Sequence, residues 1–250
     1  MISITILVKN GEKTLFETLN ALREFDEILL LDTGSTDKTL EIANRFPNVS
    51  VHKREFLGFG LMHNIATGLA KHDWVLSIDA DEVMSEGLKN EILALKLDEG
   101  TVYSLPRDNY FNGKQIKWCG WQNERCIRLY HRKKTSFSEA KVHEGVLANH
   151  LKIHLLQHPL RHTPYQSISD FLRKMEHYST LFAEEKAGKK SSSPAKALIH
   201  GLSSFLKSYL LKKGFLGGYE GLLISLYNGH TAYYKYLKLY HRNADLSSQM

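Results

Sequence analysis

Cysteine and long apolar runs are both scarce in this chain of 250 residues. The two cysteines, Cys119 and Cys126, match neither a zinc knuckle nor a redox pair, and two are too few for a disulfide framework. We therefore expect ordinary thiols in a reducing compartment. No apolar stretch reaches the roughly 20 residues that span a bilayer, and apolar residues 2–8 lack the basic leader of a secretory signal. The sequence predicts a cytoplasmic protein that is either soluble or bound at a membrane surface. If it is bound, we expect it to lie peripherally at the inner face of the cytoplasmic membrane.

Acidic residues are scarce toward the C-terminal end. Residues 195–250 contain seven lysines and arginines against Glu220 and Asp245, a net charge of +5 out of +6 for the whole chain. A basic segment beside a near-neutral body predicts an anionic partner. We expect an anionic membrane surface or another phosphorylated partner, and no nucleic acid. The alternative is a helical cap with a solvated face.

The first hundred residues alternate between strand and helix patterns. Apolar runs at 2–8, 27–31, 49–52 and 74–78 are typical of buried strands, and apolar stripes with helical spacing lie between them. This alternation predicts an α/β domain with a mostly parallel sheet. Ligands bind such sheets at the carboxyl ends of the strands. Three polar loops follow strands there, at residues 9–12, 32–37 and 79–82.

The pattern changes after residue 100. Strands are expected at 102–106 and 126–131, and Ser167 with Asp170 is a capping signal for a helix. Residues 188–194 read as a linker between this helix and two further amphipathic helices. We therefore expect an α/β domain over residues 1–165 and a helical extension over residues 166–250.

Asp79 and Asp81 follow the fourth expected strand. A period of two places both carboxylates on one face of a strand, where they repel each other unless a cation lies close by. Oxygen ligands of this kind suit Mn²⁺ or Mg²⁺, which also bind diphosphate oxygens. The alternative is a solvated loop.

Asp32 ends the second strand at the same edge. Its carboxylate is placed to accept hydrogen bonds from a base or a ribose. The alternative is a capping role for the next helix. Because Ser35 and Thr36 are better placed to cap that helix, we expect Asp32 to be free for a ligand.

Arg125 and Arg128 lie three residues apart around the strand at 126–131. Arginine forks suit a diphosphate or a phosphorylated acceptor, and ordinary salt bridges are the alternative. Trp118 and Trp121 offer either a flat face to a sugar ring or buried packing.

Three segments carry a family resemblance. ISITILVKN, EILLLDTGSTDKTLEIA and DWVLSIDADE resemble family 2 glycosyltransferases with the GT-A fold. Residues 113–146, followed by HTPY at 162–165 and a basic helical tail, resemble bacterial lipopolysaccharide-core glucosyltransferases. Family 2 enzymes transfer a sugar from a nucleotide donor.

The resemblance implies roles in donor binding. Val8 and Asn10 would line the nucleotide pocket, Asp32 would bind the uracil or ribose, and Asp79 would contact the ribose or sugar. His63 stands where relatives usually have Arg or Lys, which implies a weaker grip on the phosphates. Thr33 stands where many relatives have a second Asp.

The resemblance also implies the metal site and the base. Asp81 would bind Mn²⁺ or Mg²⁺ together with His162, which matches the late histidine of GT-A enzymes. Glu144 would take the proton of the acceptor hydroxyl, with Glu139 or Asp108 as alternatives. His143 would orient Glu144 or contact the acceptor.

We expect an inverting transferase that moves a hexose, from UDP-glucose, to a sugar hydroxyl of the lipopolysaccharide inner core. A sugar-nucleotide pyrophosphorylase is an alternative, although the loop after the first strand lacks the expected Gly- and Arg-rich sequence. An aspartyl phosphatase would place its acidic pair after the first strand. A non-catalytic sugar- or nucleotide-binding protein of the same fold is the remaining alternative.

Overall fold

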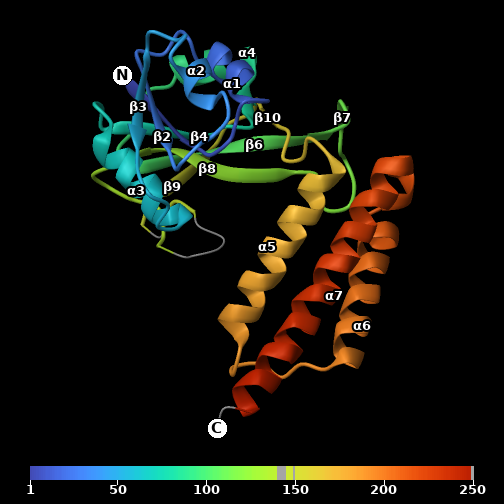
Figure 1. Cartoon of the computed structure of the whole chain (residues 1–250). Coiled ribbons are helices and arrows are strands. Elements are labelled where there is room, and N and C mark those ends of the chain that lie inside the picture. Colours follow the sequence, from blue (N-terminus) through green and yellow to red (C-terminus); the bar gives the residue numbers. More distant parts are fainter. Residues whose placement is uncertain (140–144, 149, 249–250) are drawn as a thin grey trace. The chain divides into compact units, whose positions relative to one another are not determined.

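The computed structural model describes residues 1–139, 145–148 and 150–248. The chain divides into two compact units, which are seen in Figure 1. The first comprises Met1–Asp108 and Asn123–His162, and the second comprises Asn109–Gln122 and Thr163–Met250. A division of function at residue 165 stays a prediction, since the second unit also takes a segment from the middle of the chain.

A mixed sheet forms the centre of the first unit. Its order is β3-β2-β1-β4-β8-β6-β10-β5. The four strands of the first half of the chain pair in parallel, as the sequence predicts, and β8 and β6 continue the sheet antiparallel. The bounds are β1 (Ile2–Val8), β2 (Glu27–Asp32), β3 (Val49–Lys53), β4 (Trp74–Asp79), β6 (Thr101–Phe111) and β8 (Glu124–His131).

Three short strands extend this sheet. β10 (Leu160–His162) pairs antiparallel with β5 (Glu82–Met84), and β9 (Lys152–Leu155) pairs in parallel with β6. None of them was expected from the sequence, because runs of three or four residues carry too little periodicity. β5 and β10 matter for the site because their pairing places His162 opposite Glu82.

Helices cover both faces of the parallel strands. Ile28 and Leu30 of β2 face a core shared with α1 (Leu15–Ala21), α2 (Thr39–Ala43) and α4 (Glu86–Leu93), whereas Leu29 and Leu31 pack against α3 (Phe59–Leu69). Successive residues of a strand point to opposite faces, so a strand covered on both sides is apolar throughout. All six residues of β2 are buried.

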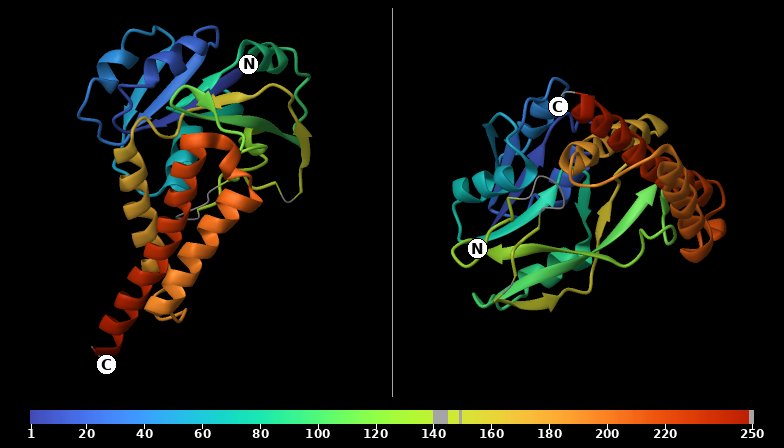
Figure 2. Two further views of the ribbon diagram at one scale, coloured as in Figure 1. Left: turned by 90° about the vertical axis from the view of Figure 1, so that its right-hand side faces the viewer. Right: turned by 90° about the horizontal axis from the view of Figure 1, so that it is seen from below.

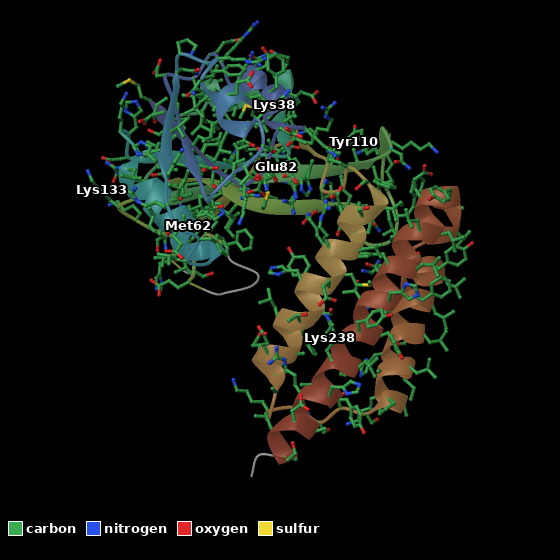
Figure 3. The ribbon with its side chains drawn as sticks, in the orientation of Figure 1. Lys38, Met62, Glu82, Tyr110, Lys133 and Lys238 are labelled. Carbon is green, nitrogen blue, oxygen red and sulfur yellow. The ribbon has the colours of Figure 1, made fainter. Side chains whose placement is uncertain are left out.

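Three helices form the second unit. α7 packs against both α5 and α6 (Figure 2). Lys238 of α7, which is labelled in Figure 3, donates a hydrogen bond to Thr180 of α5 at 2.7 Å. The bounds are β7 (Lys114–Gln115), α5 (Ile168–Lys186), α6 (Pro194–Leu206), the π-helical turn η1 (Lys207–Leu211), the 3₁₀ turn η2 (Gly214–Gly217) and α7 (Gly218–Ser248).

Glycines bring α6 and α7 close together. A Cβ on Gly201 would lie 2.9 Å from the Cβ of Tyr233, and one on Gly229 would lie 3.0 Å from that of Phe205. No helix of the described residues is long and apolar enough to cross a membrane.

Candidate active site

The carboxyl ends of β1, β2 and β3 surround a pocket of about 590 Å³. Its walls come from the residues that directly follow these strands. Three of the lining side chains are cationic, two are acidic and one is an aromatic ring. The pocket therefore has a net positive charge of one and a ring, which suit an anionic ligand that carries a flat base. The lining residues are Lys9, Asp32, Thr33, Gly34, Lys53, Arg54, Glu55 and Phe56.

Asp32 stabilises its own loop. Its carboxylate accepts hydrogen bonds from the backbone N–H groups of Gly34 and Ser35, at 3.2 and 3.1 Å. Gly34 has a φ of 98°, which favours glycine. The expectation that Ser35 and Thr36 would cap the next helix is wrong, because α2 has Lys38 at its N-cap position and no side-chain cap. Asp32 lines the pocket, and its carboxylate oxygens already accept hydrogen bonds from Gly34 and Ser35.

Asn10 explains why Ser35 and Thr36 are not caps. The backbone N–H of Asn10 donates to Oγ of Ser35, and Oδ1 of Asn10 accepts from the backbone N–H of Thr36, both at 2.8 Å. Val8, which is buried, accepts a hydrogen bond on its carbonyl from the backbone N–H of Thr33 at 3.0 Å. The loops after β1 and β2 are therefore tied together at the edge of the pocket.

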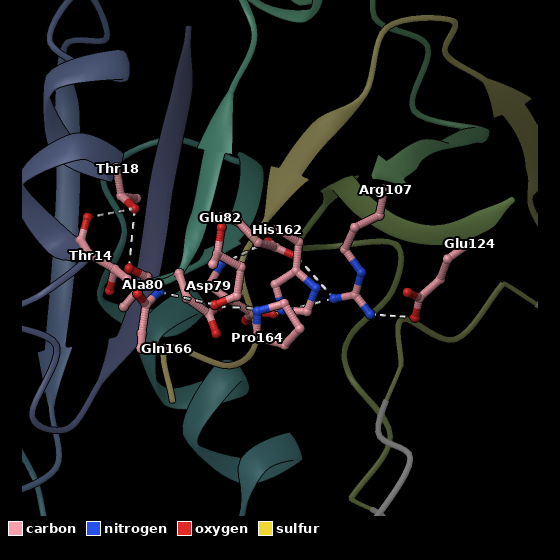
Figure 4. Close-up of polar contacts among 12 residues, drawn as sticks. Thr14, Thr18, Asp79, Ala80, Glu82, Arg107, Glu124, His162, Pro164 and Gln166 are labelled. Atoms are coloured by element: carbon pink, nitrogen blue, oxygen red, sulfur yellow. Dashed lines mark hydrogen bonds and ion pairs between the residues drawn. The ribbon is translucent and has the colours of Figure 1, made fainter. Parts of the chain in front are cut away.

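Asp79 belongs to a largely buried charge cluster, of which Figure 4 labels Asp79, Glu82, Arg107 and Glu124. Arg128 donates through both terminal nitrogens to the carboxylate of Asp79. Glu82, with no exposed surface, accepts from Arg107 at 2.9 Å, from Arg128 at 3.1 Å and from the backbone N–H of Asp79 at 2.9 Å. Glu124 completes the cluster through an ion pair with Arg107.

These charges set the ionisation of the cluster. Burial opposes ionisation of Asp79, but the guanidinium of Arg128 and the smaller effect of Arg107 hold the pKa of Asp79 well below its usual range. Burial likewise opposes the charge on Arg128, and Asp79 and Glu82 raise its pKa nonetheless. The Asp79 side chain keeps 33% of its surface exposed. It is therefore a fixed anion that a ligand can still reach.

Asp81 has a different environment. Ala80 and Asp81 form a turn between β4 and β5, so the strand period that would place both carboxylates on one face does not apply. Oδ1 of Asp81 lies 3.6 Å from Nε2 of His162, and both side chains are partly exposed. The structure thus brings together two of the predicted site residues, and it gives Asp79 and Asp81 different partners.

The described residues contain no group of three or more His, Cys, Asp or Glu side chains that could hold a metal ion. The pair Asp81 and His162 supplies one carboxylate oxygen and one ring nitrogen. Mn²⁺ accepts oxygen ligands readily and tolerates imidazole, whereas Mg²⁺ prefers an all-oxygen octahedron. The donor set therefore fits Mn²⁺ better, provided that the ligand and water contribute the other oxygens.

His63 lies in the protein interior, within electrostatic range of Asp79. It is 3% exposed, its Nδ1 lies 3.1 Å from Oγ of Ser77, and its ring stacks on Phe137 at 4.2 Å. Burial lowers the pKa of His63 to about 4, so the ring is neutral at physiological pH. The structure places this ring in the interior, and contact with donor phosphates stays a prediction.

The structure separates the two arginines of β8. Arg128 points into the buried cluster, whereas Arg125 donates to the carbonyl of Leu156 at 3.0 Å. Residues three apart on a strand lie on opposite faces. Glu144 and His143 lie outside the described residues. Of the alternative bases, Glu139 is exposed and Asp108 is partly exposed in β6.

Other aromatic and histidine residues have packing roles. Trp121 stacks on Tyr165 at 5.5 Å, and Trp118 packs against Gly217 within the second unit. His154 lies in β9 and His158 in the loop after it, where His158 contacts Glu91 at 2.9 Å. His154 and His158 therefore do not share a helix face.

Several residues of the site were not predicted from the sequence. Glu82, Arg107 and Glu124 belong to the charge cluster, and Lys53, Arg54, Glu55 and Phe56 belong to the pocket. Lys53 and Arg54 could have been predicted from the sequence, because they directly follow the third expected strand at the edge of the sheet where ligands bind. Glu82 and Arg107 carried none, because their burial depends on pairing between strands distant in sequence.

Comparison with known proteins agrees with this geometry. The family model described as "Glycosyl transferase family 2" matches residues 3–150. An uncharacterized glycosyltransferase of Rickettsia typhi is 29% identical, covering 95% of this chain and 86% of the relative. The lipopolysaccharide core biosynthesis glycosyltransferase LpsC of Rhizobium meliloti is 25% identical, covering 97% and 93%.

Among solved structures, the mannosyltransferase PcManGT from Pyrobaculum calidifontis, in complex with GDP-Man and Mn²⁺, is similar in fold. It is 14% identical, has a TM-score of 0.52, and covers 97% of this chain and 86% of that chain. The family model matches more than half of the 250 residues, and the fold is similar to that of the mannosyltransferase. The chain has a GT-A fold and belongs to glycosyl transferase family 2.

Proposed function

We propose that the chain is an inverting, Mn²⁺-dependent hexosyltransferase that uses UDP-glucose and a sugar hydroxyl of the lipopolysaccharide inner core. The observation that carries the proposal is the pairing of Asp81 with His162 at 3.6 Å, beside Asp79 and at the carboxyl end of β4. β4 neighbours β1, whose carboxyl end also borders the pocket. A donor can therefore place its nucleotide in the pocket and its diphosphate toward Asp81.

The pocket supports the nucleotide part of the proposal. Lys9, Lys53 and Arg54 offset the negative charge of a nucleoside diphosphate, and Phe56 offers a face for the base. Asp32 lines the same pocket and retains lone pairs for a ribose hydroxyl or the uracil N–H. The GDP-Man and Mn²⁺ named for the mannosyltransferase of similar fold support a nucleotide-sugar donor and a metal, and they do not bear on the choice of uracil.

Asp81 and His162 would hold the metal. When bound there, Mn²⁺ offsets the charge of the diphosphate as it departs. Asp79 has a different role, since Arg128 and Glu82 fix its position. A fixed, partly exposed carboxylate suits a hydrogen bond from a hydroxyl of the donor sugar or ribose.

The transfer is a single displacement. The acceptor hydroxyl oxygen attacks the anomeric carbon, the bond from that carbon to the diphosphate oxygen breaks, and UDP leaves with the bonding electrons. Glu144 takes the hydroxyl proton, with His143 orienting it. One displacement inverts the anomeric configuration and gives a β-linked product from an α-linked donor.

The acceptor is inferred from likeness along the whole chain. LpsC, which is named for lipopolysaccharide core biosynthesis, matches 97% of this chain. We infer a lipid-linked oligosaccharide acceptor of the same class. Arg125, which is exposed at β8, is the residue that we assign to a phosphorylated group of this acceptor.

A donor screen tests the function. The protein is incubated with Mn²⁺, a truncated lipopolysaccharide core and, in turn, UDP-glucose, UDP-galactose, UDP-N-acetylglucosamine or GDP-mannose, and transfer is followed by mass spectrometry. UDP-glucose should give the fastest transfer. Faster transfer from another sugar would overturn the donor assignment, and UDP binding without transfer or hydrolysis would favour a non-catalytic protein.

A charge-removal pair tests the pocket separately. Lys53→Gln combined with Arg54→Gln should weaken UDP binding roughly tenfold or more, because charge-assisted hydrogen bonds contribute about 1.5–3 kcal/mol each. Lys71→Gln is the matched control, because Lys71 is exposed before the amino end of β4. Equal effects of the two changes would refute the pocket assignment.

A further inference from the structure

The α6–η1–η2–α7 hairpin exposes an unusual number of apolar side chains. Ala197 and Gly201 of α6 are buried against α7, whereas the opposite side of α6 leaves Leu198, Ile199 and Leu202 at 64%, 65% and 57% exposed. We call the whole set the hairpin apolar surface. It continues through Leu206, Leu210, Leu211, Phe215, Leu216, Tyr219, Leu222 and Leu226.

The two helices present these side chains on the same side. α6 and α7 run in opposite directions and are joined by the short turns η1 and η2 (Figures 1 and 2). On each helix the exposed stripe lies to one side of the face that touches the other helix, and the rotation about the helix axis has the same sign on both. Because α6 and α7 are antiparallel, the stripe on α6 and the stripe of Tyr219, Leu222 and Leu226 on α7 then lie on the same side of the pair. The stripes therefore form one surface and not two separate ones.

The turn between the helices holds its own apolar residues firmly. A Cβ on Gly221 would lie 1.9 Å from the carbonyl oxygen of Gly214, so the chain segments touch backbone to backbone. Lys213 has a φ of 56°, in the left-handed region. This packing fixes Phe215 and Leu216, which are 50% and 58% exposed, at the end of the hairpin. A rigid turn with exposed apolar side chains is suited to insertion into a partner.

The charge of the same segment is of one sign. Lys207, Lys212 and Lys213 are exposed, and the described residues show no ion pair for any of them. Residues 194–230 contain one acidic residue, Glu220. Its side chain is buried and paired with Lys114 at 3.0 Å. No negative charge of this segment therefore faces solvent.

We propose that the hairpin apolar surface docks on an anionic lipid bilayer. Apolar side chains would enter the boundary between headgroups and acyl chains, and the three lysines would meet lipid phosphates. A second copy of the chain is a poorer occupant, because a symmetric contact would bring the lysines of both copies together. The proposal goes beyond sugar transfer and does not depend on the donor or acceptor.

Vesicle flotation tests the proposal with the full chain. Wild-type protein should float with vesicles of phosphatidylcholine and phosphatidylglycerol, and much less with phosphatidylcholine alone. Ile199→Gln combined with Leu202→Gln should weaken partitioning roughly tenfold or more, because the change removes two exposed apolar side chains from the proposed docking surface. Lys207→Gln and Lys213→Gln should each weaken it about fivefold, since a lysine near an anionic surface contributes about 1 kcal/mol.

Two matched controls separate docking from folding. Leu93→Gln changes an apolar residue of α4 that is 56% exposed, against 57% for Leu202, and Lys96→Gln changes an exposed lysine of the first unit. Both should float like wild type. Wild-type flotation of the Ile199/Leu202 variant would overturn the proposal. So would failure of the wild type to float, or a dimer in size-exclusion chromatography that only the hairpin substitutions dissociate.

Discussion

Glu82 accepts a hydrogen bond from the backbone N–H of Asp79 at 2.9 Å while it also receives Arg107 and Arg128. One fully buried carboxylate thus connects the end of β4 to β6 and β8. The position of Asp79, and through the next turn that of Asp81, therefore depends on the charge cluster around Glu82.

Glu82→Gln should therefore destabilise the fold. The change leaves Arg107 and Arg128 without one anionic partner inside the protein, and breaking a buried ion pair in this way costs about 3 kcal/mol. Urea unfolding gives the free energy directly. Glu41→Gln is the control, because Glu41 pairs with Arg45 at 2.6 Å with both side chains more than half exposed. It should cost about 0.5 kcal/mol or less, and equal costs would show that the cluster is not what stabilises β4.

His63 should make stability depend on pH. Burial lowers its pKa to about 4 from an ordinary value of 6.5. Between these values the unfolded chain binds a proton that the folded chain does not, so stability is complete above pH 6.5 and falls as the pH drops toward 4. The loss from this group is about 3 kcal/mol at most.

The pH dependence of urea unfolding measures this effect. His63→Gln should flatten the slope between pH 6.5 and 4, whatever its effect on stability at neutral pH. His241→Gln, a change at an exposed histidine of α7, should keep the wild-type slope. An unchanged slope in His63→Gln would mean that the ring is not buried in its neutral form.

Two glycine substitutions should have opposite effects. A Cβ on Gly221 would lie 1.9 Å from the carbonyl oxygen of Gly214, whereas one on Gly68 of α3 meets no atom within 4 Å. Gly221→Ala should destabilise the second unit by about 2 kcal/mol or more, because backbone must move. Gly68→Ala should stabilise α3 by about 0.5–1 kcal/mol. Thermal unfolding compares them, and a neutral Gly221→Ala would contradict the close approach.

Glu144→Gln tests the proposed base. It should lower the transfer rate about 10²–10⁴-fold and leave UDP affinity unchanged, because the change removes a proton acceptor and keeps the side-chain shape. Glu139→Gln and Asp108→Asn, at the two alternative positions, should keep rates within a few-fold of wild type. A larger loss of turnover at either of them would move the base to that residue.

Periodicity predicted most of the fold in this chain. The alternating and continuous apolar runs at Ile2–Val8 and Glu27–Asp32 marked β1 and β2, because strands buried on both faces need apolar residues throughout. β5 and β10 could not be predicted in this way. They have three residues each and form through pairing between positions almost 80 residues apart.

The candidate site was predictable where it follows a strand and not where it depends on tertiary pairing. Asp32, Asp79 and Asp81 stand directly after expected strands. Ser35 was expected to cap the next helix. It does not, because its hydroxyl oxygen accepts a hydrogen bond from the backbone N–H of Asn10, which lies on another loop. Glu82 gave no sign of being buried, since an acidic residue after a strand is usually solvated.

The proposed sugar transfer depends most on Asp81 and His162 as a metal-binding pair. Titration of Mn²⁺ in the presence of UDP, with free Mn²⁺ measured by electron paramagnetic resonance, tests this directly. Asp81→Asn and His162→Gln should each weaken Mn²⁺ binding roughly tenfold or more, since loss of a ligand or its orienting partner has effects of about this size. Asp26→Asn, at an exposed aspartate before β2, should bind like wild type. Wild-type Mn²⁺ affinity in Asp81→Asn would contradict the account.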